Sequence, residues 1–513
     1  MHNEKKESHL LTPISRRGML KLSALGLITA ALPIYAHAQS AKPIRVLLAP
    51  DANIVPGQLR GGGSTNVASC LYDWLFRLEG EGQTFTNSLA EKTQHSDDFK
   101  TWDITLRKGV KFSNGTEATA RDLVFTMARH QDDKIGSPLK DIFQHVSDIT
   151  ETDAQTVTFT LSRPDPDFLL KFLDKNAALL AHDYDYAANG NSKPCGTGPF
   201  DVEEYVPSQY MRLRKKANYF IPGLPKADTL EIMFIADQQT QLLSLESGQG
   251  DIIRTVPFDQ LKRYESHSDL DLKSLPSAYF TPISMRTDRK PFDDPRVRLA
   301  MKLVVNRQQM LDNAAFGYGE IADDDYVWPG FRYYKKRPAK EQDIEGAKRL
   351  LAEAGYPDGI DVEIVCEANR PPVMDVVLLY QQMARAANIR VNIQAVSTDI
   401  FYAKHFMKAT VVCASWGHRE ALDLLSVSVQ TDAVWNESRY SNAEVDKLIT
   451  QASAEGELGK RQEIMGRIQE ILSEDGAAII PFFHNVFAAT RKDVAGFQLT
   501  ENWINDYRHV ART

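Results

Sequence analysis

Regular alternation of strand and helix patterns in the second half of the chain restricts its fold more than any other feature. Apolar runs rich in β-branched residues predict strands: IDVEIV from Ile360, VNIQAV from Val391 and TVVCAS from Thr410. Helical patterns lie beside them at Asp343 to Ala354, Val373 to Ala387 and about Ile400 to Met407. Because strand–helix–strand units normally close a parallel sheet, this half is predicted to be α/β with a parallel sheet.

Other segments extend this pattern to a mixed α and β chain. The first half carries strand patterns, IRVLLA from Ile44, WDITL from Trp102 and TVTFTL from Thr156, and a helical patch at Ala120 to Arg129. Alternation of Trp102, Ile104 and Leu106 predicts one buried face. Further helices are predicted at Asp294 to Leu311, Ala443 to Ser453 and Lys460 to Leu472, followed by the strand AIIPFF. Asp343 is a predicted N-cap, with Gly355 as the stop of its helix.

The N-terminus has the pattern of an export signal, residues 1–38. A basic segment runs into an apolar stretch from Leu22 to Ile34, which is shorter than the roughly 20 residues that span a bilayer. Small residues at Ala36 and Ala38 predict cleavage before Gln39. The string SRRGMLK, from Ser15, resembles a twin-arginine motif, although the pair also fits a general secretory signal. The first cysteine is Cys70, which disfavours a lipid anchor and predicts a free periplasmic protein.

Charge and cysteine content argue against nucleic acid and metal as partners, whereas the disulfide state of the cysteines stays open. Without its signal, which holds five of the 60 basic and two of the 68 acidic residues, the chain has 55 against 66, a net charge of −11. Nucleic acid is therefore not an expected partner. Four cysteines have no C-x-x-C pairing and no histidine at metal-ligand spacing, so no metal or cofactor is expected. A disulfide is allowed by the compartment but cannot be assigned.

A periplasmic hydrolase is the competing function, and it would require the sequence motif of a catalytic site. The chain lacks G-x-S-x-G, H-E-x-x-H and G-x-x-x-x-G-K-[ST] strings. Ser64 follows three glycines in GGGSTN, an order that favours a flexible loop over an activated serine. SPLK, at Ser137, matches S-x-x-K but has no companion K-T-G. We therefore expect no enzyme and no catalytic residue.

A series of strings resembles the extracytoplasmic solute-binding proteins, family 5, which serve peptide and nickel ABC importers. They follow that family's order over nearly the whole chain after the signal: LYDWLFRL from Leu71, LRKGVKFSNGTEATARDLVFTMAR from Leu106, GTGPF from Gly196, KPFDDPRVRLAMKLVVNRQQML from Lys290, EGAKRLLAEAGYPDG from Glu345, RYSNAEVDKLI from Arg439 and IPFFHNVFAATRKDVAGF from Ile480. Most of these residues are expected to be scaffold, with turns at the glycines and core at the apolar positions.

The resemblance implies a bilobal, hinged α/β fold with an extra subdomain in the first lobe. Its expected parts are residues 39–79 and 186–278 for the first lobe, 80–185 for the subdomain, 279–480 for the second lobe and 481–513 for the return to the first. Two crossing strands, near 277–284 and 479–483, would form the hinge. It also implies a monomeric receptor that delivers a small molecule, such as a peptide, opine, glycoside or metal chelate, to an ABC permease with its ATPases. A periplasmic chaperone or sensor on the same fold stays open.

Trp416 heads the predicted ligand contacts, because the strand TVVCAS ends just before it and ligands of parallel sheets lie beyond the carboxyl ends of strands. In the family, the corresponding tryptophan lies at the cleft. Its indole would offer a flat face and one N–H donor. The string GHREALD that follows lacks the D-Y-x-D-P pattern with which peptide binders hold an amino terminus. Arg419 is predicted to bind a carboxylate or phosphate, and Asp423 to receive an amine or sugar hydroxyls, or to pair with Arg419.

Three further residues are predicted to face the cleft. Tyr279 and Thr281 stand at alternate positions of the first crossing strand, whose side chains would point the same way. Asn66, next to Thr65, is expected in a loop after the first strand. His484, beside the second crossing, is interpreted as structural rather than as a metal ligand.

Overall fold

The computed structural model describes residues 42–51, 53–78 and 85–513. The predicted export signal and its cleavage point lie outside these ranges. The described residues form sheets of eight, five and four strands and two short two-stranded sheets, β2 (Phe76–Leu78) with β3 (Phe85–Asn87) and β20 (Val494–Ala495) with β21 (Ala511–Arg512). None of their helices is long and apolar enough to cross a membrane. All four cysteines are free and buried.

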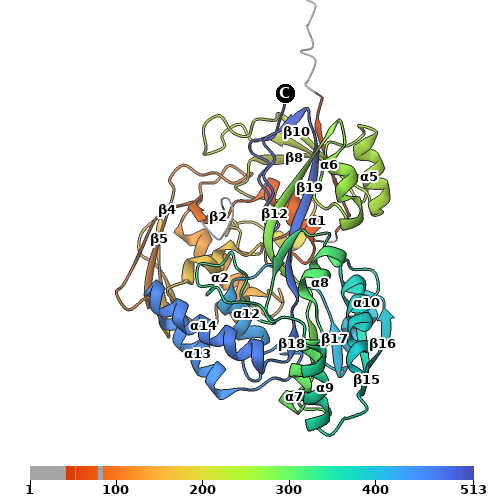
Figure 1. The fold of residues 1–513 in the computed structure, drawn as a ribbon. Helices are drawn as coiled ribbons and strands as arrows, with labels where there is room; N and C mark the ends of the chain where they lie inside the picture. Colours follow the sequence, from red (N-terminus) through yellow and green to blue (C-terminus); the bar gives the residue numbers. More distant parts are fainter. Residues whose placement is uncertain (1–41, 52, 79–84) are drawn as a thin grey trace, which may run out of the picture. The chain divides into compact units, whose positions relative to one another are not determined.

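The eight-stranded sheet joins the two ends of the described chain. Its order is β12 (Leu270–Phe280), β19 (Phe482–Arg491), β11 (Ile252–Ile253), β1 (Ile44–Leu48), β10 (Thr229–Phe234), β9 (Tyr210–Lys215) and β8 (Phe200–Val206), with β14 (Gly319–Ile321) also paired to β19. β1 runs parallel to β10 and β11, and the other pairs are antiparallel. Beside it lie the helices α1 (Gly62–Leu71), α5 (Gln238–Glu246) and α6 (Leu261–Glu265) (Figure 1).

The four-stranded sheet is antiparallel and shares a hydrophobic core with the eight-stranded sheet. Its order is β4 (Ala90–His95), β5 (Thr101–Leu106), β7 (Thr156–Leu161) and β6 (Val146–Glu151). Trp102, Ile104 and Leu106 are buried, which confirms the predicted face of β5. α2 (Ala120–Gln131) begins with a capping box between Thr119 and Asp122. Short helices follow: α3 (Leu139–Ile142), η1 (Phe168–Leu173) and α4 (Tyr186–Asn189).

The five-stranded sheet is only partly the predicted parallel sheet. Its order is β16 (Ile389–Val396), β15 (Ile360–Glu367), β17 (Val411–Cys413), β13 (Ile283–Met285) and β18 (Ala478–Ile479). β15 is parallel to β16 and β17, as expected from the helical crossovers. β13 and β18 are antiparallel additions, because they belong to the two segments that enter and leave this sheet.

Helices of this region mostly agree with the sequence patterns. α9 (Ile344–Glu353) is capped by Asp343, which accepts a hydrogen bond from the Gly346 N–H at 2.7 Å, and α10 is Val373–Ala384. The single helix predicted at 294–311 is wrong: α7 (Pro295–Leu303) ends and α8 (Arg307–Ala314) begins, because Asn306 caps a new N-terminus. The segment near 400–407 is α11 (Thr398–Ile400) followed by one π-turn, η4 (Phe401–His405).

Helices α12 (Ala421–Ser428), α13 (Ala443–Ala454) and α14 (Leu458–Glu474) build a separate hydrophobic core with a segment near 326–333. α13 and α14 pack against one another and appear side by side in Figure 1. We call the part built on the eight- and four-stranded sheets lobe 1, and the part built on the five-stranded sheet and these helices lobe 2.

Two adjacent connections join the large sheets. The chain leaves the eight-stranded sheet after Phe280 and enters the five-stranded sheet at Ile283. Within this excursion β14 pairs with the first residues of β19, and the chain returns for the last time between Ile479 and Phe482. β12 pairs with β19 on one side of these connections and β13 with β18 on the other, so the two crossing segments run next to each other. This topology confirms the bilobal α/β fold class.

Candidate functional site

A cavity of about 510 Å³, which we call the cleft cavity, is lined by segments of both lobes. This volume is within the range typical of small-molecule sites. Lobe 1 contributes residues at the start of α1, in the 170–175 segment and at 501–503, and lobe 2 contributes Arg370, residues 416–420 and Trp435. Arg370 and Trp416 follow β15 and β17, so the cavity lies beyond the carboxyl ends of the parallel strands.

Trp416 lines the cleft cavity and is fixed from behind. Its backbone exchanges two hydrogen bonds with Phe280, 2.9 and 3.2 Å long, and its ring stacks on the Phe280 ring with centroids 6.3 Å apart. The ring of Trp435 meets it edge-on at 6.2 Å. Burial raises the pKa of Glu437 to about 7, and the hydrogen bond that the Ser284 hydroxyl donates to its Oε1 at 2.6 Å opposes this shift. Trp416 offers a ligand its flat face.

Positive charge gathers around Arg419. Its guanidinium carbon lies 5.2 Å from the centre of the Trp435 ring. Burial lowers the pKa of Lys175; Asp174 opposes this effect, and the nearby charges of Arg60 and Arg419 lower the pKa further. Within the described part of the chain, Arg60 and Lys175 donate to main-chain carbonyl groups, and neither of them nor Arg419 forms an ion pair with a carboxylate.

Tyr279 and Asp423 also line the cleft cavity, and both have partners. The Tyr279 hydroxyl accepts a hydrogen bond from the indole N–H of Trp503, and burial raises the pKa of this tyrosine. Asp423 binds the Lys171 ammonium of lobe 1, with 2.8 Å between Oδ1 and Nζ. The alternative that Asp423 pairs with Arg419 is therefore wrong, because a cation from the opposite lobe occupies the carboxylate.

Asn66 and Thr281 do not line the cavity. Asn66 lies in α1 rather than in the expected loop, is 1% exposed, and accepts hydrogen bonds from Asn505 (2.6 Å) and Tyr507 (2.7 Å). It ties α1 to the C-terminal segment. Thr281 is 1% exposed between β12 and β13. The expected loop is instead the first turn of α1, in which Gly62 and Gly63 let Trp503 and the Ala49 carbonyl approach where a Cβ would clash.

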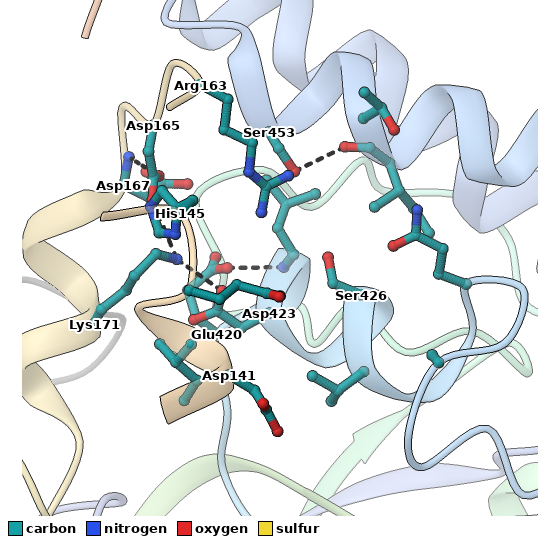
Figure 2. A pocket seen from close by; sticks show the side chains of 18 of the residues that line it. Asp141, His145, Arg163, Asp165, Asp167, Lys171, Glu420, Asp423, Ser426 and Ser453 are labelled. Atoms are coloured by element: carbon teal, nitrogen blue, oxygen red, sulfur yellow. Dashed lines mark hydrogen bonds and ion pairs between the residues drawn. The ribbon is translucent and has the colours of Figure 1, made fainter. Parts of the chain in front are cut away.

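A second cavity of about 650 Å³, which we call the acidic cavity, is shown in Figure 2. Residues 141–145 and 162–171 of lobe 1 and helices α12 and α13 of lobe 2 line it. Five carboxyl groups belong to its lining: Asp141, Asp165, Asp167, Glu420 and Asp423. The two cavities share Ile142, Lys171, Glu420 and Asp423, so these residues form the wall between them.

Comparisons with known proteins fit this geometry. Residues 84–423 match the family described as bacterial extracellular solute-binding proteins, family 5 Middle. The chain belongs to this family. It is 27% identical to the glutathione-binding protein GsiB of Escherichia coli (strain K12) over 491 residues, which cover 93% of this chain and 95% of that protein.

Two solved structures share this fold. AgaA from A. tumefacien R10, in complex with agropinic acid, has a TM-score of 0.78, 21% identity, and coverage of 92% and 99% of the two chains. NikA from Staphylococcus aureus, in complex with Ni(L-His)2, has a TM-score of 0.76, 23% identity, and coverage of 91% and 99%. In the described residues of the present protein, no group of three or more His, Cys, Asp or Glu side chains could hold a metal ion.

This family 5 protein is therefore a solute-binding protein of an ABC importer, and its relatives are binding proteins rather than enzymes. Its cleft cavity contains residues that sequence reasoning missed: Arg60, Lys175, Arg370, His418 and Trp503. Burial lowers the pKa of His418 to about 3, so this side chain is neutral. Two of them had a sequence signal, since Arg60 precedes the three glycines and His418 stands two residues after Trp416, whereas Lys175, Arg370 and Trp503 lie outside the quoted strings.

Proposed function

We propose that this solute-binding protein captures a small organic anion, with Arg419, Arg60 and Lys175 facing its carboxylate or phosphate groups. The observation that carries the proposal is the convergence of these cations on one cavity without a carboxylate partner in the described chain. Like charges held together in a partly buried site repel one another, and a bound anion relieves that repulsion. Arg419 also has the forked geometry that holds a carboxylate through two hydrogen bonds.

A buried arginine behind the cavity adds to this positive field. Arg254 is 3% exposed, its guanidinium carbon lies 4.1 Å from the centre of the Trp503 ring, and it donates to the Thr500 carbonyl at 3.0 Å. Burial lowers the pKa of Arg254 to about 10, which leaves it charged at neutral pH. Trp503 thus separates a fixed charge from the cleft cavity and presents its own ring there.

Trp416 and Tyr279 complete the proposed contacts. Trp416 supplies apolar area against which the carbon skeleton of the solute packs, and Tyr279 adds a second ring from β12 to the cavity lining. Asp423 lines the cleft cavity, but its carboxylate is paired with Lys171, so we expect it to contribute little to ligand binding. Glutathione, the solute named for GsiB, bears carboxylates, as does agropinic acid. Peptide-like and opine-like acids are therefore the first solutes to try.

The test is calorimetric titration with glutathione and with its dialkyl ester, which lacks the carboxylates. If glutathione binds, the ester should bind much more weakly, and Arg419→Gln should weaken glutathione binding by about 2 to 5 kcal/mol, the cost of leaving a buried charge unpaired. Arg385→Gln, which removes an exposed arginine outside both cavities, is the matched control. Equal binding of acid and ester would refute an anionic ligand.

We further propose that ligand binding closes the lobes about the two crossing segments, since these run side by side between the two large sheets, with β14 paired next to them on β19. The receptor would act as a monomer in the periplasm, after twin-arginine export and cleavage near Ala38, and hand its solute to permease and ATPase subunits. The export proposal rests on the SRRGMLK string alone.

A further inference from the structure

Phe99 stands out in lobe 1 because its backbone has a conformation that bulky residues rarely adopt. It lies in the turn between β4 and β5, and its φ is +54°. This left-handed region favours glycine or asparagine, so an aromatic residue there is strained. Strain of this kind persists only where the surrounding structure holds the residue in place.

Lobe 1 fixes both the ring and the main chain of Phe99. The ring stacks on His95 with centroids 4.7 Å apart, and its centroid lies 6.3 Å from that of Trp102. The Phe99 carbonyl accepts hydrogen bonds from the Trp102 indole N–H at 3.3 Å and from the Asp165 N–H at 3.1 Å. The second bond ties this turn to the segment 165–171, so the two form one continuous edge of lobe 1.

The Phe99 ring contacts Gly456 of lobe 2, in the connection between α13 and α14. A Cβ atom added at Gly456 would lie 2.5 Å from Cε2 and 2.8 Å from Cζ of Phe99, which is closer than real Cβ atoms come to a neighbour. The φ of Gly456 is not positive, so the backbone does not require glycine at this position. It is the close approach of the Phe99 ring that requires the missing side chain.

The segment 165–171 contacts the neighbouring helices of lobe 2 through charged groups. Asp167 accepts a hydrogen bond from Arg461, in the first turn of α14, at 2.6 Å. The Lys171 ammonium binds Asp423, in the first turn of α12, at 2.8 Å (Figure 2). Asp167, Arg461 and Lys171 are largely buried, so solvent and salt screen these pairs less than surface pairs.

These three contacts, Phe99 with Gly456, Asp167 with Arg461 and Lys171 with Asp423, are called the clasp below. In Figure 1, β4 and β5 lie above α13 and α14 at the left of the view, whereas β12, β19 and β18, which border the crossing segments, run through its centre. Rotation about the crossing segments moves distant parts of the lobes furthest. A contact at the clasp therefore resists opening more than a contact beside the crossing segments.

We propose that the clasp holds the lobes closed in part of the ligand-free protein. This inference rests on the proposed movement of the lobes but not on the identity of the solute. Because a solute enclosed between the lobes binds the closed form, its affinity includes the free energy of closing them. Phe99 and Gly456 do not belong to the lining of either cavity. Their contact thus strengthens the binding of every solute alike, without touching any of them.

Electron–electron double resonance on the ligand-free protein measures the closed fraction directly. Glu151→Cys, in β6 of lobe 1, and Lys447→Cys, in α13 of lobe 2, provide two exposed sites for spin labels. The four native cysteines are buried, so they stay unlabelled in the folded protein. The distance between the two labels then distinguishes closed from open protein.

Two variants break the ring contact from opposite sides. Phe99→Gly removes the ring and suits a φ of +54°, so the turn itself is not weakened by backbone strain. Gly456→Ala places a methyl group against the ring from lobe 2, in a connection at the surface. Gly459→Ala is the matched control, because a Cβ there would meet only Glu457 Oε1, at 3.9 Å.

The ligand-free wild type is expected to show a short, closed distance beside a longer one. The ratio of closed to open protein should fall at least about threefold in Phe99→Gly and in Gly456→Ala and stay unchanged in Gly459→Ala. If Phe99→Gly fails to fold by circular dichroism, Gly456→Ala decides alone. The proposal is wrong if the wild type shows no closed distance, or if the folded variants keep the wild-type ratio. No solute is present, so this result is independent of the comparison of acid and ester that tests the anionic ligand.

Discussion

Replacing Asp167 by alanine tests how strongly the two lobes are bound to one another. Asp167, which precedes η1 in lobe 1, accepts from Arg461 of α14 and from the Tyr333 hydroxyl of lobe 2. Arg461 is 2% exposed, and its Nε and Nη2 atoms have no hydrogen-bond partner in the described chain. Asp167→Ala therefore leaves the buried guanidinium of Arg461 without its carboxylate partner.

The expected loss follows from that burial. Removing one partner of a buried ion pair costs about 3 to 5 kcal/mol, because the other charge stays desolvated. Arg332, which also binds Asp167, has 49% of its side chain exposed and adds little. For the unit of about 470 residues, an unfolding entropy of roughly 2.1 cal/mol/K per residue gives roughly 1 kcal/mol/K, so Tm should fall by about 3 to 5 °C.

Differential scanning calorimetry of the ligand-free protein measures this change. The double variant Asp167→Leu with Arg461→Met should recover most of the lost Tm, because buried pairs are commonly replaced by apolar residues at little cost. Arg332→Gln should lower Tm by less than about 1 °C. A drop below about 1 °C in Asp167→Ala, or no recovery in the double variant, would refute the reasoning.

Four other outcomes are expected. The raised pKa of Glu420, about 8 in the folded protein, means that the folded state holds a proton that the unfolded state releases above about pH 4.5, so the contribution of this group to stability should fall from pH 5 to 8, and urea titrations of wild type and Glu420→Gln should differ by that slope. Trp416→Ala should weaken ligand binding by about 2 kcal/mol or more in calorimetry, with wild-type affinity counting against its contact. Ligand should reduce the radius of gyration in X-ray scattering; an unchanged curve at saturation argues against closure. Arg16→Lys with Arg17→Lys should block maturation near Gln39, and unchanged processing would exclude the twin-arginine route.

Local patterns in the sequence were sufficient for much of the fold. The alternation in β5, the Asp343 cap of α9 and the strands β15 and β16 follow from side chains within one or two turns or pleats of each other. Such patterns depend on near neighbours in the chain and need no knowledge of the rest. The family could be predicted because many short strings resemble family 5 in the same order along the chain. Proteins that share a scaffold need the same turn and core residues at corresponding positions.

Tertiary structure decided which polar groups meet. Asp423 found its partner in Lys171, 252 residues earlier, and Arg461 found Asp167, 294 residues away. Asn66 was expected at the cleft, yet it is buried because the C-terminal segment brings Asn505 and Tyr507 to it. A polar side chain in a strand or loop pattern fits a ligand, a lobe contact or a buried network equally well. Only the packing of distant segments determines which acceptor is left without a donor, because that depends on groups that no local pattern can place.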